Sequence, residues 1–118
     1  MTRATKADAD AILLAFLRGE QSTIGPYKIT ENVSPGEIGM CIAYDNIWAV
    51  GTRGGALVVW FDLSRPAERV LLGAVERLTG VSLLRVPTEG ENLLSATVLG
   101  PLGLAALHAS LTTTTVGD

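Results

Sequence analysis

The stretch that most constrains the fold covers residues 39–63, GMCIAYDNIWAVGTRGGALVVWFDL. Large and small side chains alternate along Ile38–Tyr44, and this period of two predicts a β-strand. Two further apolar segments follow, and each is separated from the segment before it by turn-forming residues. The stretch therefore predicts a three-stranded antiparallel meander over about residues 38–63.

The positions of two tight turns set the expected register of this meander. Asp45 and Asn46 tolerate the positive φ that a two-residue hairpin turn requires, and Arg53–Gly54 is expected at the second tip. The first turn predicts four cross-strand pairs, which are Tyr44 with Ile47, Ala43 with Trp48, Ile42 with Ala49 and Cys41 with Val50.

Both faces of the predicted meander are apolar. One face is expected to carry Trp48, Val50, Leu57, Val59, Phe61 and Leu63, and the other Met40, Ile42, Tyr44, Ile47, Ala49, Val58 and Trp60. The two tryptophans, Trp48 and Trp60, thus fall on opposite faces. Because a solvated face would show polar residues, either helices cover both faces or another subunit covers one. A one-residue slip in either turn would reassign the faces but would leave both apolar.

Two to three helices are expected, at about residues 6–18, 65–79 and 102–111. Thr5 and Ser64 are the predicted N-caps of the first two, and Gly80 is the predicted C-cap of the second. Pro66 suits a first helical turn. In the second helix the charged residues Glu68, Arg69, Glu76 and Arg77 are expected to face water.

The remaining segments complete an α+β pattern. Tyr27–Val33 alternates partially and predicts an edge strand, while Val81–Val86 and Leu93–Leu99 predict two more strands. The order strand, helix, strand around residues 65–79 also allows one parallel pair through a right-handed crossover. We therefore expect one α+β domain over residues 1–118, with a mainly antiparallel sheet of five to six strands.

Composition narrows the classes of function. The net charge is −3 and charged residues make up 18% of the chain, below the usual value of about 25%. This acidity argues against a nucleic-acid footprint. A single cysteine, Cys41, excludes an internal disulfide, and residues 1–10 lack the apolar run of a secretion signal. We expect an intracellular protein, or one within a virus-like particle, that no signal peptide secretes.

Asn92–Leu111 contains no Asp, Glu, Lys or Arg. Its length permits a membrane span, but its polar residues and the lack of basic flanks favour a buried strand, turn and helix. No membrane span is therefore predicted.

No residue pattern predicts catalysis, a metal site or a cofactor. His108 is the only histidine and belongs to no nucleophile motif. Gly51–Gly55 could cradle an anion through its backbone N–H groups, but it lacks the ending of a phosphate-binding loop and a following helix. A hairpin turn is the simpler interpretation. Asp62 lies at the end of a strand, a position where functional acids can occur. Because Ser64 is beside it, local capping is the simpler explanation for an acid at this position.

Two functional hypotheses follow. The first is a non-enzymatic structural subunit that oligomerises or packs with other proteins, with a virion or tail-type particle as the favoured setting. Its interface candidates are Trp48, Trp60, Tyr44 and Phe16. The second is a small-ligand-binding or regulatory domain with a pocket between sheet and helices, for which the candidates are Arg53, Gly54 and Asp62. A weaker third hypothesis is an enzyme that uses Asp62, His108 or Cys41.

Overall fold

The computed structural model describes residues 4–31, 38–83 and 93–113. Helices and strands follow one another in the order α1 (Lys6–Leu17), β1 (Thr23–Ile24), β2 (Tyr27–Glu31), β3 (Ile38–Tyr44), β4 (Ile47–Arg53), β5 (Ala56–Asp62), α2 (Pro66–Thr79), β6 (Leu93–Leu99) and α3 (Pro101–Thr113).

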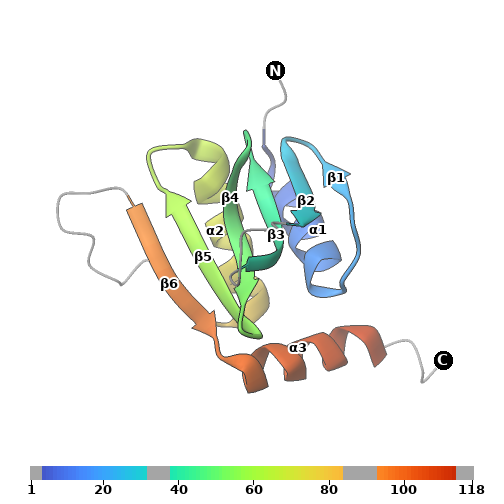
Figure 1. The fold of residues 1–118 in the computed structure, drawn as a ribbon. Coiled ribbons are helices and arrows are strands. Elements are labelled where there is room, and N and C mark those ends of the chain that lie inside the picture. The colour runs from blue at the N-terminus through green and yellow to red at the C-terminus, as the bar shows by residue number, and fades with distance from the viewer. Residues whose placement is uncertain (1–3, 32–37, 84–92, 114–118) are drawn as a thin grey trace.

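The six strands form one antiparallel sheet in which their spatial order equals their order in the chain. Helices α1 and α2 lie behind this sheet in Figure 1, and α3 runs beneath its lower end. The α+β prediction, with a mainly antiparallel sheet and three helices, is confirmed. None of the described helices is long and apolar enough to span a membrane.

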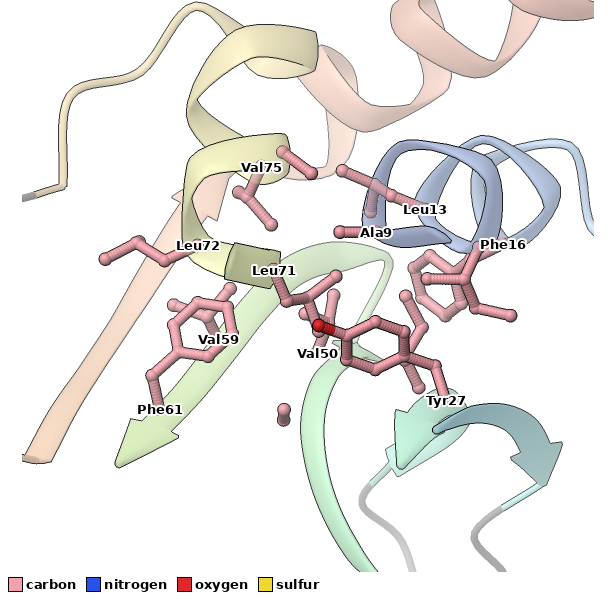
Figure 2. Packing of buried hydrophobic residues seen from close by; sticks show 14 of the residues in the cluster. Ala9, Leu13, Phe16, Tyr27, Val50, Val59, Phe61, Leu71, Leu72 and Val75 are labelled. Atoms are coloured by element: carbon pink, nitrogen blue, oxygen red, sulfur yellow. The ribbon is translucent and has the colours of Figure 1, made fainter. Parts of the chain in front are cut away.

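The hydrophobic core lies between the sheet and the pair α1 and α2. Apolar side chains of the two helices meet those of β2, β4 and β5 in Figure 2, which labels Ala9, Leu13, Phe16, Tyr27, Val50, Val59, Phe61, Leu71, Leu72 and Val75. All of these residues are buried. This core fixes which face of the sheet remains uncovered.

The first hairpin turn of the meander lies where the sequence predicts it. Asp45 and Asn46 have φ values of 53° and 66°, and Tyr44 pairs with Ile47. The second tip is one residue later than predicted, at Gly54–Gly55, where φ is 57° and 83°. Glycine adopts these positive φ values without steric cost, whereas arginine does not. The later tip shifts the β4–β5 pairing by two residues, so it leaves the faces unchanged.

An extra residue in β4 overturns part of the predicted register. Ala43 pairs with Trp48 as predicted, but Ile42 pairs with Val50, so Ala49 has no partner of its own. The predicted pairs of Ile42 with Ala49 and of Cys41 with Val50 are therefore wrong. One unpaired residue reverses the alternation between faces. As a result Ile42 and Tyr44 share the helix-covered face with Val50, and Trp48 lies on the opposite face.

The outer strands also differ from the prediction. β2 is not an edge strand, because the two-residue strand β1 pairs along its outer side. Val81–Leu83 is neither helix nor strand, and residues 84–86 of the predicted strand lie outside the described residues. Among the described strands every pair is antiparallel, so the crossover is not found there.

Two of the three predicted helix caps are confirmed. The backbone N–H of Asp8 donates to Thr5 Oγ1 at 3.1 Å, and Gly80 ends α2 with a φ of 75°. The predicted cap Ser64 is wrong, because Arg65 occupies the N-cap position and makes no side-chain cap. The hydroxyl of Ser64 instead donates to Asp62.

Candidate interaction surface

One face of the sheet has no helix over it among the described residues (Figure 1). We call it the open face. The strand pairing places Trp48, Val58 and Trp60 on it, together with Ser95 and Thr97 of β6. Its middle is apolar and its outer strand carries hydroxyl groups, so the face differs from the charged exterior typical of a monomer.

Trp48 and Trp60 form the centre of the open face. Their ring centroids are 6.5 Å apart, within the distance range of interacting aromatic pairs, and the rings are tilted by 49°. The prediction that they lie on opposite faces is wrong because of the extra residue in β4. The side chain of Trp60 is 42% exposed, and Leu93 nearby on β6 is 43% exposed. Large apolar surface therefore remains in contact with water.

A shallow depression of about 530 Å³ follows the two tryptophans across β4, β5 and β6. It is lined by Ile47, Trp48, Arg53, Val58, Val59, Trp60, Ser95, Ala96 and Thr97. The lining combines aromatic and aliphatic carbon with hydroxyl groups and one cation at the rim. This mixture resembles the core and rim of a protein interface.

The other two interface candidates lie on the helix-covered side. Phe16 is buried in the core on α1. The ring of Tyr44 lies 6.3 Å from that of Tyr27, and Arg65 Cζ lies 6.0 Å from the centre of the Tyr44 ring. The structure therefore brings Trp48 and Trp60 together but does not add Tyr44 or Phe16 to their surface.

The ligand-binding candidates are divided between the two ends of β5. Arg53 and Gly54 stand at the tip between β4 and β5, whereas Asp62 is the last residue of β5, at the other end of that strand. Seven residues at about 3.3 Å each separate the two ends by roughly 20 Å. Of the three, only Arg53 lines the depression on the open face.

A polar cluster joins β5 to α2, and sequence reasoning predicted only its contact between Asp62 and Ser64. Asp62 Oδ1 accepts hydrogen bonds from the backbone N–H and the hydroxyl of Ser64, at 3.0 and 2.5 Å. The backbone N–H of Asp62 in turn donates to Glu68 Oε1 at 2.6 Å. Arg65 Nε lies 3.7 Å from both carboxylates. The cluster fixes the direction in which the chain leaves the sheet.

Glu68 is buried at 2% exposure, which corrects the prediction that it faces water. Burial raises the pKa of its carboxyl group, although the hydrogen bond from Asp62 opposes this effect. The hydrogen bonds from Ser64 lower the pKa of Asp62. One sequence signal could have indicated this burial. Glu68 is the third residue of a helix that starts at Pro66, and an acid at that position can accept a hydrogen bond from a backbone N–H before the helix.

The three residues of the enzyme hypothesis lie apart. Cys41 is buried on β3, and burial raises the pKa of its thiol. His108 Nδ1 lies 2.8 Å from the carbonyl oxygen of Leu17, where α3 meets the end of α1. Asp62 stands at the far end of β5 from α3. Within the described residues, no three His, Cys, Asp or Glu side chains gather closely enough to hold a metal ion.

A second pocket, of about 400 Å³, separates α3 from α1 and the lower end of the sheet. It is lined by Phe16, Leu17, Gly19, Met40, Thr52, Gly55, Pro101, Leu104, Ala105 and His108. The leucines of α3 that face the core leave this space only partly filled. The pocket lies between sheet and helices and is mostly apolar.

Comparison with protein-family models, with curated proteins and with solved structures gave no match. The open face and the pocket beside α3 are therefore the features of this chain that bear on its function.

Proposed function

We propose that this chain is a non-enzymatic subunit of a protein assembly and that the open face is buried in that assembly. One observation carries the proposal. Trp48 and Trp60 lie in contact, with tilted rings, at the centre of a sheet face that no described helix covers. Tryptophan is enriched at the energetic centres of protein interfaces, and exposed apolar patches on soluble proteins mark interaction sites.

The energy available from this contact is sufficient to matter. A tryptophan side chain buries up to about 250 Å² of surface, and each Å² removed from water contributes about 25 cal/mol. Because Trp60 is 42% exposed, covering it completely would contribute roughly 2–3 kcal/mol. Val58 and Leu93 would add to this contribution.

The proposed setting is a particle built of many protein copies, such as a virion or tail-type structure. Two features support it. Charged residues make up only 18% of the chain, and Asn92–Leu111 contains none, so much of the β6–α3 surface is suited to contact with protein. The proposal places the chain inside cells or particles and involves no contact with nucleic acid.

The native size of the chain in an extract of its source tests this proposal. A tagged copy is expected to elute in a complex several times larger than 12.4 kDa. Trp60→Lys should shift the tagged chain to smaller sizes, because it places a charge at the centre of the open face. Ala11→Lys, at an exposed position of α1, is the matched control and should leave the complex intact. Elution of the unmodified chain at monomer size would contradict the proposal.

The pocket between α3 and the lower end of the sheet favours a second candidate function, the binding of a small apolar ligand. Its volume of about 400 Å³ falls within the range of ligand sites. A ligand found by thermal-shift screening should lose its effect in Ala105→Trp, since the indole would fill the pocket. It should keep its effect in Ala106→Trp, which lies on an exposed part of α3. Equal effects in both variants would place the ligand elsewhere.

A further inference from the structure

The two edges of the sheet differ in how they are protected. On one side the sheet ends with β1, a strand of only two residues. On the other it ends with β6, a seven-residue strand with the sequence LLSATVL. Natural edge strands are usually short or carry charged residues or proline, which prevent pairing with other chains. β6 is not short and carries no charge and no proline; its one irregularity is the extra residue Val98, since Leu57 pairs with Leu99 and Val58 with Thr97.

The outer edge of β6 has no strand partner among the described residues. The helix that follows does not cover it either. α3 leaves the lower end of β6 and runs beneath the sheet towards α1 (Figure 1), where His108 Nδ1 approaches the carbonyl of Leu17 at 2.8 Å. The row of backbone N–H and C=O groups along β6 is therefore suited to pairing with another strand.

The sequence of β6 is chemically symmetric about Ala96. Two apolar residues, one hydroxyl residue, alanine, one hydroxyl residue and two apolar residues follow in order along Leu93–Leu99. Consequently, a two-fold axis through Ala96 would place Ser95 opposite the partner's Thr97 and Leu94 opposite the partner's Val98. Such a self-complementary contact is what a symmetric dimer requires.

The sides to which these residues point agree with this pairing. Ser95 and Thr97 are exposed on the open face, while Leu94 and Val98 are buried. Val98 has no partner on β5, so the regular alternation of β6 ends at Thr97. Residues directly opposite each other in an antiparallel pair share a face of the sheet. The pairing thus matches hydroxyl with hydroxyl and apolar with apolar, and no charged group lies in the strand to oppose it.

We propose that two copies of this chain pair edge to edge through β6, antiparallel and centred on Ala96, to form one continuous twelve-stranded sheet. The inference rests on the proposed function, because it names the partner as a second copy and identifies the contact through which assembly begins. Both open faces then lie on the same side of the joined sheet, so the tryptophan surface is doubled.

Light scattering of the purified chain across a dilution series tests the dimer. The expected mass is twice 12.4 kDa at high concentration, falling towards 12.4 kDa on dilution. A monomer at every concentration would overturn the inference. A large complex in the source extract would then still support the proposed function, so the two failures are distinguishable.

Charge substitutions at positions 95 and 97 test the register. The double variant Ser95→Lys with Thr97→Lys places a lysine of one copy opposite a lysine of the other at two positions, so the dimer should be lost. The double variant with glutamate at both positions should lose the dimer for the same reason. An equal mixture of the two double variants should recover a heterodimer. Ser95→Lys with Thr97→Glu puts opposite charges face to face and should retain a homodimer, which also controls for folding because it alters the same two positions.

Each alternative result has a definite meaning. A wild-type-like dimer of the double-lysine variant would overturn pairing through β6. Loss of the dimer in the Lys and Glu variant would overturn the register centred on Ala96. Trp60→Lys should preserve the dimer, since Trp60 lies on the face and not at the edge. If Trp60→Lys alone abolished it, the open face would be the contact between copies, which contradicts the edge pairing but agrees with the proposed function.

Discussion

Glu68 is the buried carboxylate in the cluster between β5 and α2, and its burial couples stability to pH. Its folded pKa is raised above 4.5, so its contribution to stability is complete below pH 4.5 and is lost as pH rises through the folded value. The unfolding free energy of wild type relative to Glu68→Gln should therefore fall as pH increases above 4.5, and it should stop falling once the pH exceeds the raised pKa. Urea unfolding of both proteins measures this difference, and a difference independent of pH would contradict the prediction.

Cys41 provides a residue-scale test of the assignment to the sheet interior. It is 2% exposed, and burial raises the pKa of its thiol, so thiol reagents should modify it only when the structure opens. Labelling in native buffer should be at least about a hundredfold slower than in denaturant. As a control, Ser110→Cys in a Cys41→Ala background should label quickly in both conditions, because position 110 is exposed. Fast native labelling of Cys41 would contradict its placement.

At this scale sequence reasoning succeeded where a residue acts through its immediate neighbours. Thr5 caps α1 because the N–H that it satisfies lies three residues away in a regular turn. Glu68 was misplaced because its partner, the N–H of Asp62, precedes the helix across an irregular turn. Helical periodicity describes faces within a helix and does not show where the preceding chain runs.

The turn between β3 and β4 allows a test at the scale of elements. Asn46 has a φ of 66°, in the left-handed region that β-branched residues avoid. Asn46→Val should cost about 1–2 kcal/mol of unfolding free energy, whereas Asn46→Gly should be neutral or slightly stabilising. Chemical denaturation measures both variants. Equal stability of the valine and glycine variants would show that the turn does not hold this conformation.

The elements themselves could be predicted because their periods and their turn residues agree. The unpaired residue in β4 could not, because alanine fits either face of a sheet and gives no sign that it lacks a partner. Its effect is large, since it moves Trp48 to the face that carries Trp60. The candidate interaction surface was therefore visible in the sequence as two residues but not as one site.

At the scale of the whole molecule, the layers differ in how firmly they are held. α2 buries six residues against the core, whereas α3 contacts the core through partly buried leucines, and Leu102 at its start is 88% exposed. Backbone amides of α3 in the monomer should exchange with deuterium at least about tenfold faster than those of α2. Equal protection of the two helices would mean that α3 is bound as firmly as the core.

The arrangement of layers also explains which sequence expectation stayed open. Because both faces of the meander are apolar, the sequence indicated that both are shielded from water. It could not show whether helices or another subunit shield each face, since that depends on where helices distant in sequence pack. The structure places α1 and α2 on the same face. The second face is therefore the one that the assembly proposal concerns.

The strands are synthesised in the same order in which they lie across the sheet. Between β5 and β6, however, the ribosome must first make α2 and residues 80–92. A growing chain can thus complete β1 to β5 while the outer side of β5 still lacks its neighbour. At about 5–20 residues per second, the roughly thirty residues from Asp62 to Leu93 take about 2–6 seconds to translate. Until β6 is made and pairs, the backbone N–H and C=O groups on the outer side of β5 lack a strand partner.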